Sequence, residues 1–279
     1  MNLPLVSVLM TSFNREKYIA AAIESVLAST HGNFELIIVD DQSKDSTAAI
    51  AKTYAGKDQR VRVYVNEKNL GDYPNRNKAA SYATGEYLKY VDSDDYIYPW
   101  GLELLVKMME EFPASGWGLC SLVQDYAKPF PFELTPKQAY EYNYLGPGLF
   151  HKAPLSSIIR KKIFDEVGGF APGRMVGDSE MWHKLAQKYK VLLMPDGIVW
   201  NREHELQEVK SRFKYMVEYE KIMIRYLRSA DCPLDPDTAS KILERRMEHS
   251  RWEFIKSSFR FNPETLKLQW KRWRSYHGK

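Results

Sequence analysis

The chain contains 279 residues, 44% hydrophobic and 27% charged, which is enough for one large domain or a domain with an appendage. No stretch approaches the 18 or more apolar residues of a membrane-spanning helix, and residues 1–14 lack the basic region of a signal peptide. Cys120 and Cys232 form neither a disulfide framework nor a metal-ligand motif, which favours a cytoplasmic location.

The net charge of +4 comes from the C-terminal end. Residues 241–279 hold eleven Lys and Arg against four Glu, whereas residues 1–240 hold 29 basic and 32 acidic side chains. Nucleic-acid-binding domains concentrate basic side chains on one surface. The slightly acidic body therefore argues against nucleic acid as a partner.

The first hundred residues alternate short apolar runs with amphipathic segments. Strands are predicted at residues 5–10, 34–39, 61–65 and 87–91, and helices at residues 18–29, 46–54 and 75–83. Strands that alternate with helices of about ten residues predict βαβ units and a mainly parallel sheet.

Polar side chains follow three of these strands at the point where each strand ends. Thr11 follows the first strand, Asp41 the second, and Asp92, Asp94 and Asp95 the fourth. Each has a simpler interpretation as a helix cap or turn residue. However, ligands of open α/β sheets bind beyond the carboxyl ends of the strands, so this coincidence predicts a binding site.

Asp92 and Asp94 lie two residues apart and can share one face of the emerging strand. Neighbouring carboxylates repel each other unless a cation compensates, and Mg²⁺ or Mn²⁺ favours such oxygen ligands. The alternative is an acidic turn that caps the helix predicted to begin near Tyr98 and Pro99. The sequence has no phosphate-binding glycine loop, so a metal ion would have to neutralise a diphosphate.

Four short motifs resemble those of the family 2 inverting glycosyltransferases with the GT-A fold. The motifs lie at residues 6–15, 38–43, 85–87 and 91–95, and the resemblance covers about residues 4–205. It implies an α/β fold with a mainly parallel central sheet flanked by helices. It also implies a glycosyltransferase domain at 1–205 and a helical basic C-terminal extension at 206–279. Within the first domain, residues 1–97 would form the nucleotide-sugar-binding half and residues 98–205 the acceptor-binding and catalytic half.

The resemblance also implies roles for individual side chains around the donor. Thr11 and Phe13 would line the pocket for the nucleotide base, and Asp41 would bind the base, which is usually uracil. Asp92 would reach the ribose, and Asp94 would bind the divalent ion. Arg76 would lie near the donor. Residues 72–74 depart from the small residues that usually precede the family's Arg-Asn pair.

The second half contains a Gly-Gly-Phe turn at residues 168–170 and an acidic helix start at Asp178. In the family this helix start carries the catalytic base, so the resemblance assigns that role to Asp178. The family usually has Glu before this Asp, and here Gly177 takes its place. The alternative is that Asp178 is only an N-cap of the helix that follows.

Three further observations concern histidine and tryptophan side chains. His204 resembles the second member of the family's Arg-x-His element, near the metal or diphosphate, although a lone His is more often structural. His183 is predicted at the surface. Trp117 and Trp182 are predicted in the core or in the wall of an acceptor site.

Beyond residue 205 the chain predicts helices at 206–229 and 236–259 and a shorter helix after Pro263. Residues 266–274 are basic and aromatic, which suits a segment that lies at an anionic membrane surface. The alternative is a helix that packs its Leu and Trp on the body and leaves Lys and Arg in water.

The predicted function is an inverting glycosyltransferase that uses a UDP-sugar and Mn²⁺ or Mg²⁺. A glycan or lipid-linked acceptor is expected, in surface polysaccharide or glycolipid synthesis, with the protein cytoplasmic or peripheral on the inner face of the membrane. The alternative is a non-catalytic relative that binds nucleotide or glycan as an assembly subunit. Retention of Asp41, Asp92, Asp94 and Asp178 together favours the enzyme. A nucleotidyltransferase would need a glycine-rich loop after Met10, which is absent.

Overall fold

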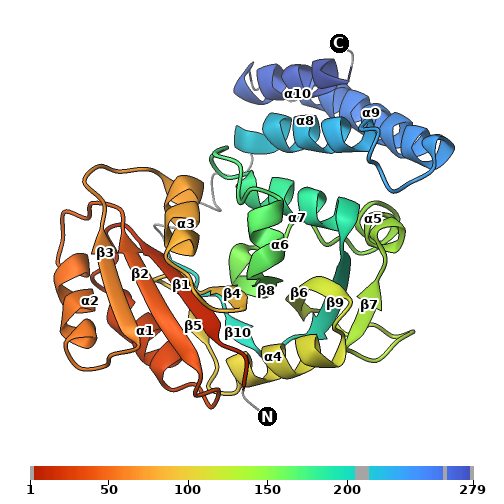
Figure 1. Cartoon of the computed structure of the whole chain (residues 1–279). Helices are drawn as coiled ribbons and strands as arrows, with labels where there is room; N and C mark the ends of the chain where they lie inside the picture. Colours follow the sequence, from red (N-terminus) through yellow and green to blue (C-terminus); the bar gives the residue numbers. More distant parts are fainter. Residues whose placement is uncertain (1–2, 205–213, 260–262, 277–279) are drawn as a thin grey trace.

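A mixed eight-stranded sheet organises the first 200 residues in the computed structural model, which describes residues 3–204, 214–259 and 263–276 (Figure 1). Its strands lie in the order β3 (Val61–Val65), β2 (Phe34–Asp40), β1 (Val6–Ser12), β4 (Tyr87–Tyr90), β8 (Ser157–Arg160), β6 (Ser115–Leu122), β9 (Lys190–Pro195) and β7 (Phe132–Leu134). The first four are parallel, whereas β8 is antiparallel to both β4 and β6. A two-stranded ribbon pairs β5 (Tyr96–Ile97) with β10 (Val199–Trp200).

Helices cover both faces of this sheet because side chains alternate along each strand. In β1, Val6 and Val8 pack into one hydrophobic cluster and Leu9 into the other. The first cluster includes α1 (Ile19–Leu27), α2 (Thr47–Ala55) and α4 (Gly101–Glu111). The second includes α3 (Asp72–Ser81), α5 (Pro136–Leu145), α6 (Lys161–Glu166) and α7 (Gly177–Lys188).

The four strands and three helices predicted in the first hundred residues are present, with one notable shift. Helix α3 begins at Asp72, three residues before the predicted start. Pro74 therefore lies in its first turn, where the backbone N–H has no partner within the helix and its loss breaks no bond. This earlier start places Tyr73 and Arg76 on one rigid element.

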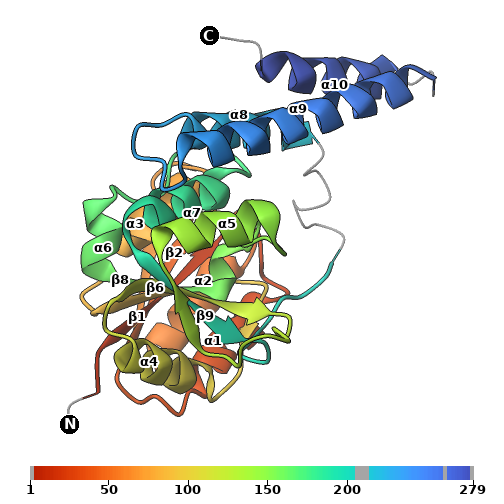
Figure 2. The ribbon, with the colours of Figure 1, turned by 90° about the vertical axis from the view of Figure 1, so that its right-hand side faces the viewer.

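Three C-terminal helices, α8 (Met216–Leu227), α9 (Pro236–Phe259) and α10 (Pro263–Ser275), lie together at one end of the molecule, opposite the N-terminus (Figures 1 and 2). The start of the helix predicted at 206–229 falls on residues 205–213, outside the described residues. Helix α8 contacts α7 through the ion pair of Arg225 with Glu180, at 2.5 Å.

The last helix is fixed to α8 by a buried polar network. Arg272 donates to Glu220 through Nε and Nη2 at 2.7 and 2.6 Å, and the Tyr276 hydroxyl donates to the other oxygen of the same carboxylate. Such buried charges require this kind of pairing, because an isolated ion costs several kcal/mol to desolvate. One face of α10 therefore packs on the body, but through Arg272 and not through its Trp residues as the second alternative predicts, since Trp270 is exposed. Within the described ranges, no helix is long and apolar enough to span a bilayer.

The prediction that His183 lies at the surface was wrong. Its side chain is 3% exposed and packs beside the rings of Phe150 and Tyr226. The Tyr144 hydroxyl lies 2.5 Å from Nε2, and burial lowers the pKa of His183 to about 4. The cause is tertiary packing: α5, through Tyr144, and α8, through Tyr226, both cover the face of α7 that carries His183. Trp117 and Trp182 are fully buried and stacked on each other.

Candidate active site

The polar residues that follow the parallel strands meet at one edge of the sheet. Ser12 at the end of β1 pairs with Asp40 at the end of β2, and Tyr90 of β4 lies opposite Leu9 of β1. The residues after β4 therefore emerge beside those that follow β1. This is the carboxyl edge at which an open α/β sheet binds ligands.

The residues assigned to the base pocket differ in exposure. Thr11 is partly buried in β1, whereas Phe13 is 44% exposed in the loop that follows. Asp41 is buried, and its two carboxylate oxygens accept from the backbone N–H groups of Leu70 and Gly71, each at 2.8 Å. Asp41 thus holds the loop between β3 and α3 against the end of β2.

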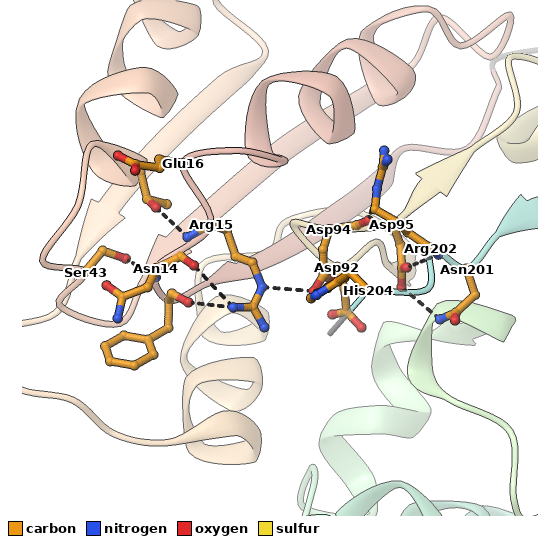
Figure 3. Close-up of polar contacts among 12 residues, drawn as sticks. Asn14, Arg15, Glu16, Ser43, Asp92, Asp94, Asp95, Asn201, Arg202 and His204 are labelled. Carbon is orange, nitrogen blue, oxygen red and sulfur yellow. Dashed lines mark hydrogen bonds and ion pairs between the residues drawn. The ribbon is translucent and has the colours of Figure 1, made fainter. Parts of the chain in front are cut away.

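The three carboxylates after β4 face three different partners. Asp92 accepts from Arg76 Nη1 at 2.6 Å, and Arg76 also binds Asp72. Asp94 Oδ2 accepts from Arg15 Nε at 2.9 Å and lies 3.0 Å from His204 Nε2 (Figure 3). The predicted donor-site residues Arg76, Asp92, Asp94 and His204 are therefore brought together.

The third carboxylate, Asp95, turns towards the segment after β10. It accepts from the backbone N–H of Arg202 at 2.9 Å and from the Asn201 side chain at 3.3 Å (Figure 3). Burial and, second, the charge of Asp92 raise the pKa of Asp95 to about 8. Burial also raises the pKa of Asp92, against the effect of Arg76. Burial therefore disfavours the ionised forms of both Asp92 and Asp95.

Asp94 and His204 are two candidate ligands of a divalent ion, although among the described residues no group of three or more His, Cys, Asp or Glu side chains could hold one. Mg²⁺ prefers octahedral ligands at about 2.1 Å, so two adjacent ligand atoms lie about 3 Å apart. The separation of Asp94 Oδ2 and His204 Nε2 is 3.0 Å. Stacking of the His204 ring on Tyr18, at 4.7 Å between centroids, fixes its orientation. Mg²⁺ commonly takes few protein ligands and completes its shell with phosphate oxygens and water.

Asp178 lies in the first turn of α7 and is partly buried. The N-cap of this helix is Val176, and Asp178 Oδ1 accepts from the adjacent N–H of Ser179, at 2.6 Å. Burial raises the pKa of Asp178 to about 6, while Ser179 and the Tyr73 hydroxyl hold it lower. A carboxyl group with this pKa can accept and release a proton near neutral pH.

A link between α3 and the Gly-Gly-Phe turn brings the two halves of the site together. The Asn77 side chain donates to the carbonyl of Phe170 and accepts from its N–H, at 2.8 and 2.9 Å. Gly168 and Gly169 have φ of +77° and +68°, which favour glycine. As a result Asp178 lies close enough to Asp72 and Arg76 for their charges to influence its pKa.

Two arginines in the site had no role predicted from the sequence. Arg15 follows Asn14, whose φ of +54° turns the loop after β1 and directs the guanidinium towards Asp94 (Figure 3). Arg202 Nε donates to the backbone carbonyl of Asp94 at 2.9 Å. The sequence did contain a hint of both roles, because each arginine lies two residues from a predicted site residue. Arg15 ends the first motif, and Arg202 begins the Arg-x-His element.

The model of the family described as "Glycosyl transferase family 2" matches residues 7–168, more than half of the chain. The chain belongs to this family. The matched segment contains the sheet edge with Asp41, Asp92 and Asp94, and it ends just before Asp178 and His204.

The chain is similar in sequence to glycosyltransferases from two bacteria. Glycosyltransferase GlyG of Streptococcus pneumoniae is 26% identical over 252 residues, covering 82% of this chain and 81% of GlyG. Putative teichuronic acid biosynthesis glycosyltransferase TuaG of Bacillus subtilis is 42% identical over 107 residues, covering 38% of this chain and 41% of TuaG. The second similarity spans less than half of either protein.

Among solved structures, S. aureus TarS 1–349 superposes with a TM-score of 0.70 at 21% identity, covering 97% of this glycosyltransferase and 79% of that chain. The same TarS fragment in complex with UDP-GlcNAc gives a TM-score of 0.67. These likenesses confirm the predicted GT-A fold.

Proposed function

We propose that the enzyme transfers a sugar from a UDP-sugar to an acceptor hydroxyl by one in-line displacement that inverts the anomeric carbon. The observation that carries this proposal is the position of Asp178. It is a partly buried carboxyl group with a pKa of about 6, close enough to Arg76 to be influenced by its charge, and Arg76 is ion-paired with Asp92. Such a displacement needs a base on one side of the anomeric carbon and a site that stabilises the leaving group on the opposite side.

In this mechanism Asp178 accepts the proton of the attacking hydroxyl as the new bond to C1 forms. Asp94 and His204 hold the divalent ion, which supplies Lewis-acid stabilisation of the diphosphate leaving group. Asp92 contacts the ribose, and Arg76 fixes Asp92 and adds positive charge beside the donor. Thr11, Phe13 and Asp41 surround the base: Phe13 offers an exposed ring for stacking, and Asp41 orders the loop at its edge.

Two relatives support UDP as the nucleotide. One solved structure of TarS contains UDP-GlcNAc, and an Escherichia coli relative, 40% identical over 105 residues, is named as a UDP-Glc:alpha-D-GlcNAc-diphosphoundecaprenol beta-1,3-glucosyltransferase. A mannosyltransferase from Pyrobaculum calidifontis, solved with GDP-Man and Mn²⁺, superposes with a TM-score of 0.63 at 14% identity. The choice between uracil and guanine is therefore the first question for an experiment.

UDP with Mn²⁺ is expected to raise the Tm by about 5 °C at a concentration near 100 times its Kd, since a ligand that binds only the folded state stabilises it. GDP and ADP at the same concentration should raise it less. EDTA should reduce the effect of UDP. Differential scanning fluorimetry measures all of these combinations. A larger shift with GDP than with UDP would contradict the proposed base.

The acceptor is proposed to be a glycan or a lipid-linked glycan in surface polysaccharide or glycolipid synthesis. The names of TuaG, a putative teichuronic acid enzyme, and of the E. coli diphosphoundecaprenol enzyme support this class. A lipid-linked acceptor would place the reaction at the inner surface of the membrane, with the enzyme otherwise in the cytoplasm.

One face of α10 suits contact with such a surface. Lys267, Trp270, Lys271 and Arg274 follow the spacing i, i+3, i+4, i+7 and are all exposed, whereas Arg272 faces inwards. Trp270 is 40% exposed, and the Arg274 guanidinium lies 5.1 Å from its ring centroid. We define these four residues as the basic face of α10. An aromatic ring among cations suits the interface of an anionic membrane.

The variant Lys267→Glu/Lys271→Glu/Arg274→Glu is expected to weaken binding to vesicles that contain phosphatidylglycerol by roughly tenfold or more, since each basic side chain near an anionic surface contributes about 1 kcal/mol. Co-sedimentation with vesicles measures this binding. Added salt should weaken the wild-type interaction, because it screens exposed charges.

Lys52→Glu/Lys57→Glu/Lys68→Glu is the matched control, because it changes the net charge equally on exposed positions of the body. It should retain most of the vesicle binding. If the wild-type chain does not bind anionic vesicles, or if the control loses as much binding as the α10 variant, the basic face of α10 is not a membrane-binding surface.

A further inference from the structure

Tyr73 of α3 and Gly177 of α7, which lie beside the proposed base Asp178, are in direct contact. A Cβ atom added to Gly177 would lie 2.6 Å from two carbon atoms of the Tyr73 ring and 2.8 Å from a third. Carbon atoms in proteins do not approach this closely without movement of one partner. A side chain at position 177 and the present position of Tyr73 therefore exclude each other.

The Tyr73 ring has little freedom to move away. It is 4% exposed, and it packs against the Phe170 ring with 5.3 Å between centroids. Phe170 is itself held by the two hydrogen bonds with Asn77. Tyr73 belongs to the first turn of α3 and is followed by Pro74, which restricts its backbone. The ring is thus wedged between α3 and the start of α7.

The hydroxyl of Tyr73 is directed at Asp178. It favours the ionised form of the carboxyl group and so lowers the pKa of Asp178, against the effect of burial. Burial and the charge of Asp178 in turn raise the pKa of the Tyr73 phenol well above its ordinary value. The phenol therefore stays protonated and acts as a neutral hydrogen-bond donor to the base.

We propose that Tyr73 is a positioning residue for Asp178, and that its ring fills the space that a side chain at position 177 would otherwise occupy. This inference depends on the proposed role of Asp178 as the base. Its physical consequence concerns charge. A second carboxylate beside Asp178 would disfavour the ionised base, whereas a neutral phenol stabilises it. An enzyme with Tyr73 and Gly177 should therefore keep Asp178 ionised, and so active as a base, at a lower pH than an enzyme with a carboxylate at position 177.

Tyr73→Phe tests this inference, because it keeps the ring and removes only the hydroxyl. The acid limb of the pH profile of kcat/KM is expected to move upward by about one unit, since a donor to the ionised carboxylate is lost. The Tm and the KM for the donor should change little. Tyr90→Phe is the matched control. Its hydroxyl belongs to the same aromatic cluster but donates to the Arg76 carbonyl, at 3.3 Å, so its acid limb should stay in place.

A second set of variants tests whether the ring fills this space. Tyr73→Ala should lower kcat/KM by about tenfold or more, and Gly177→Glu added to it should restore part of this loss, because the new side chain enters the space of the ring. In the presence of Tyr73, Gly177→Glu should instead lower the Tm by several degrees, since overpacking typically costs about 1–3 kcal/mol.

The outcomes separate this inference from the proposed function. A Tyr73→Phe profile that coincides with the wild-type profile, or a Tyr73→Ala/Gly177→Glu enzyme no more active than Tyr73→Ala, would overturn the positioning role of Tyr73 and leave Asp178 as the base. Full activity of Asp178→Asn would overturn the base assignment itself, whatever the Tyr73 variants show.

Discussion

Asp178→Asn is expected to lower kcat by about 10²- to 10⁴-fold, the usual contribution of a general base. The amide keeps the shape of the side chain and can still accept from the N–H of Ser179, but it cannot take the proton of the acceptor. Donor affinity should change little, because Asp178 serves the acceptor side. Steady-state kinetics with donor and acceptor varied in turn measure both effects.

The pKa of Asp178 adds a pH dependence to this expectation. Because the folded protein raises this pKa from 3.8 to about 6, wild-type kcat/KM should fall as the pH drops below about 6. The folded state also binds this proton more tightly than the unfolded state does. Ionised Asp178 therefore destabilises the fold above about pH 6, and this cost disappears as the pH falls towards 4. Asp178→Asn should accordingly have a Tm at neutral pH no lower than that of the wild type.

Glu180→Gln provides the matched control for Asp178→Asn. Glu180 lies in the same first turn of α7, but its carboxylate is paired with Arg225 of α8. The control should lose at most a little stability and keep its activity, since partly exposed ion pairs contribute about 1 kcal/mol or less. If Asp178→Asn transfers sugar at nearly the wild-type rate, Asp178 is a structural residue and the base lies elsewhere.

Asp94→Ala is expected to abolish the metal dependence of UDP binding and to lower kcat by about 10²-fold or more, because charge stabilisation on the leaving group is a large part of transfer catalysis. In the wild type, Mn²⁺ should increase the Tm shift caused by UDP. In the variant, UDP should give the same small shift with Mn²⁺ and with EDTA. Equal stabilisation of variant and wild type by Mn²⁺ and UDP would show that Asp94 does not hold the ion.

Asp95→Asn separates the role of Asp94 from a general effect of removing charge. Its pKa of about 8 means that Asp95 is largely protonated at neutral pH, so the amide resembles its native state. It also faces Asn201 and Arg202 instead of His204. This variant should therefore keep both the metal response and most of the activity.

Local pattern was sufficient to predict the strands and helices of the first hundred residues. These strands are short apolar runs between polar turns, and these helices have one apolar face, so each element is specified by residues within about ten positions. The gathering of polar residues at one edge of the sheet could be predicted as well, because parallel strands must present their carboxyl ends at one edge. The order of Thr11, Asp41 and Asp92 along the chain was therefore enough to bring them together.

Only the tertiary structure decided which of these side chains meet and which face is covered. Asp94 and His204 are 110 residues apart, and adjacent Asp94 and Asp95 contact different partners. His183 is buried because α5 and α8 both pack over α7. Tyr73 and Gly177 are far apart in the sequence but in direct contact in the fold. Close packing and the pairing of buried charges join segments that are distant in the chain. The hydrophobic periodicity of one segment therefore cannot predict which side chains of another segment it will contact.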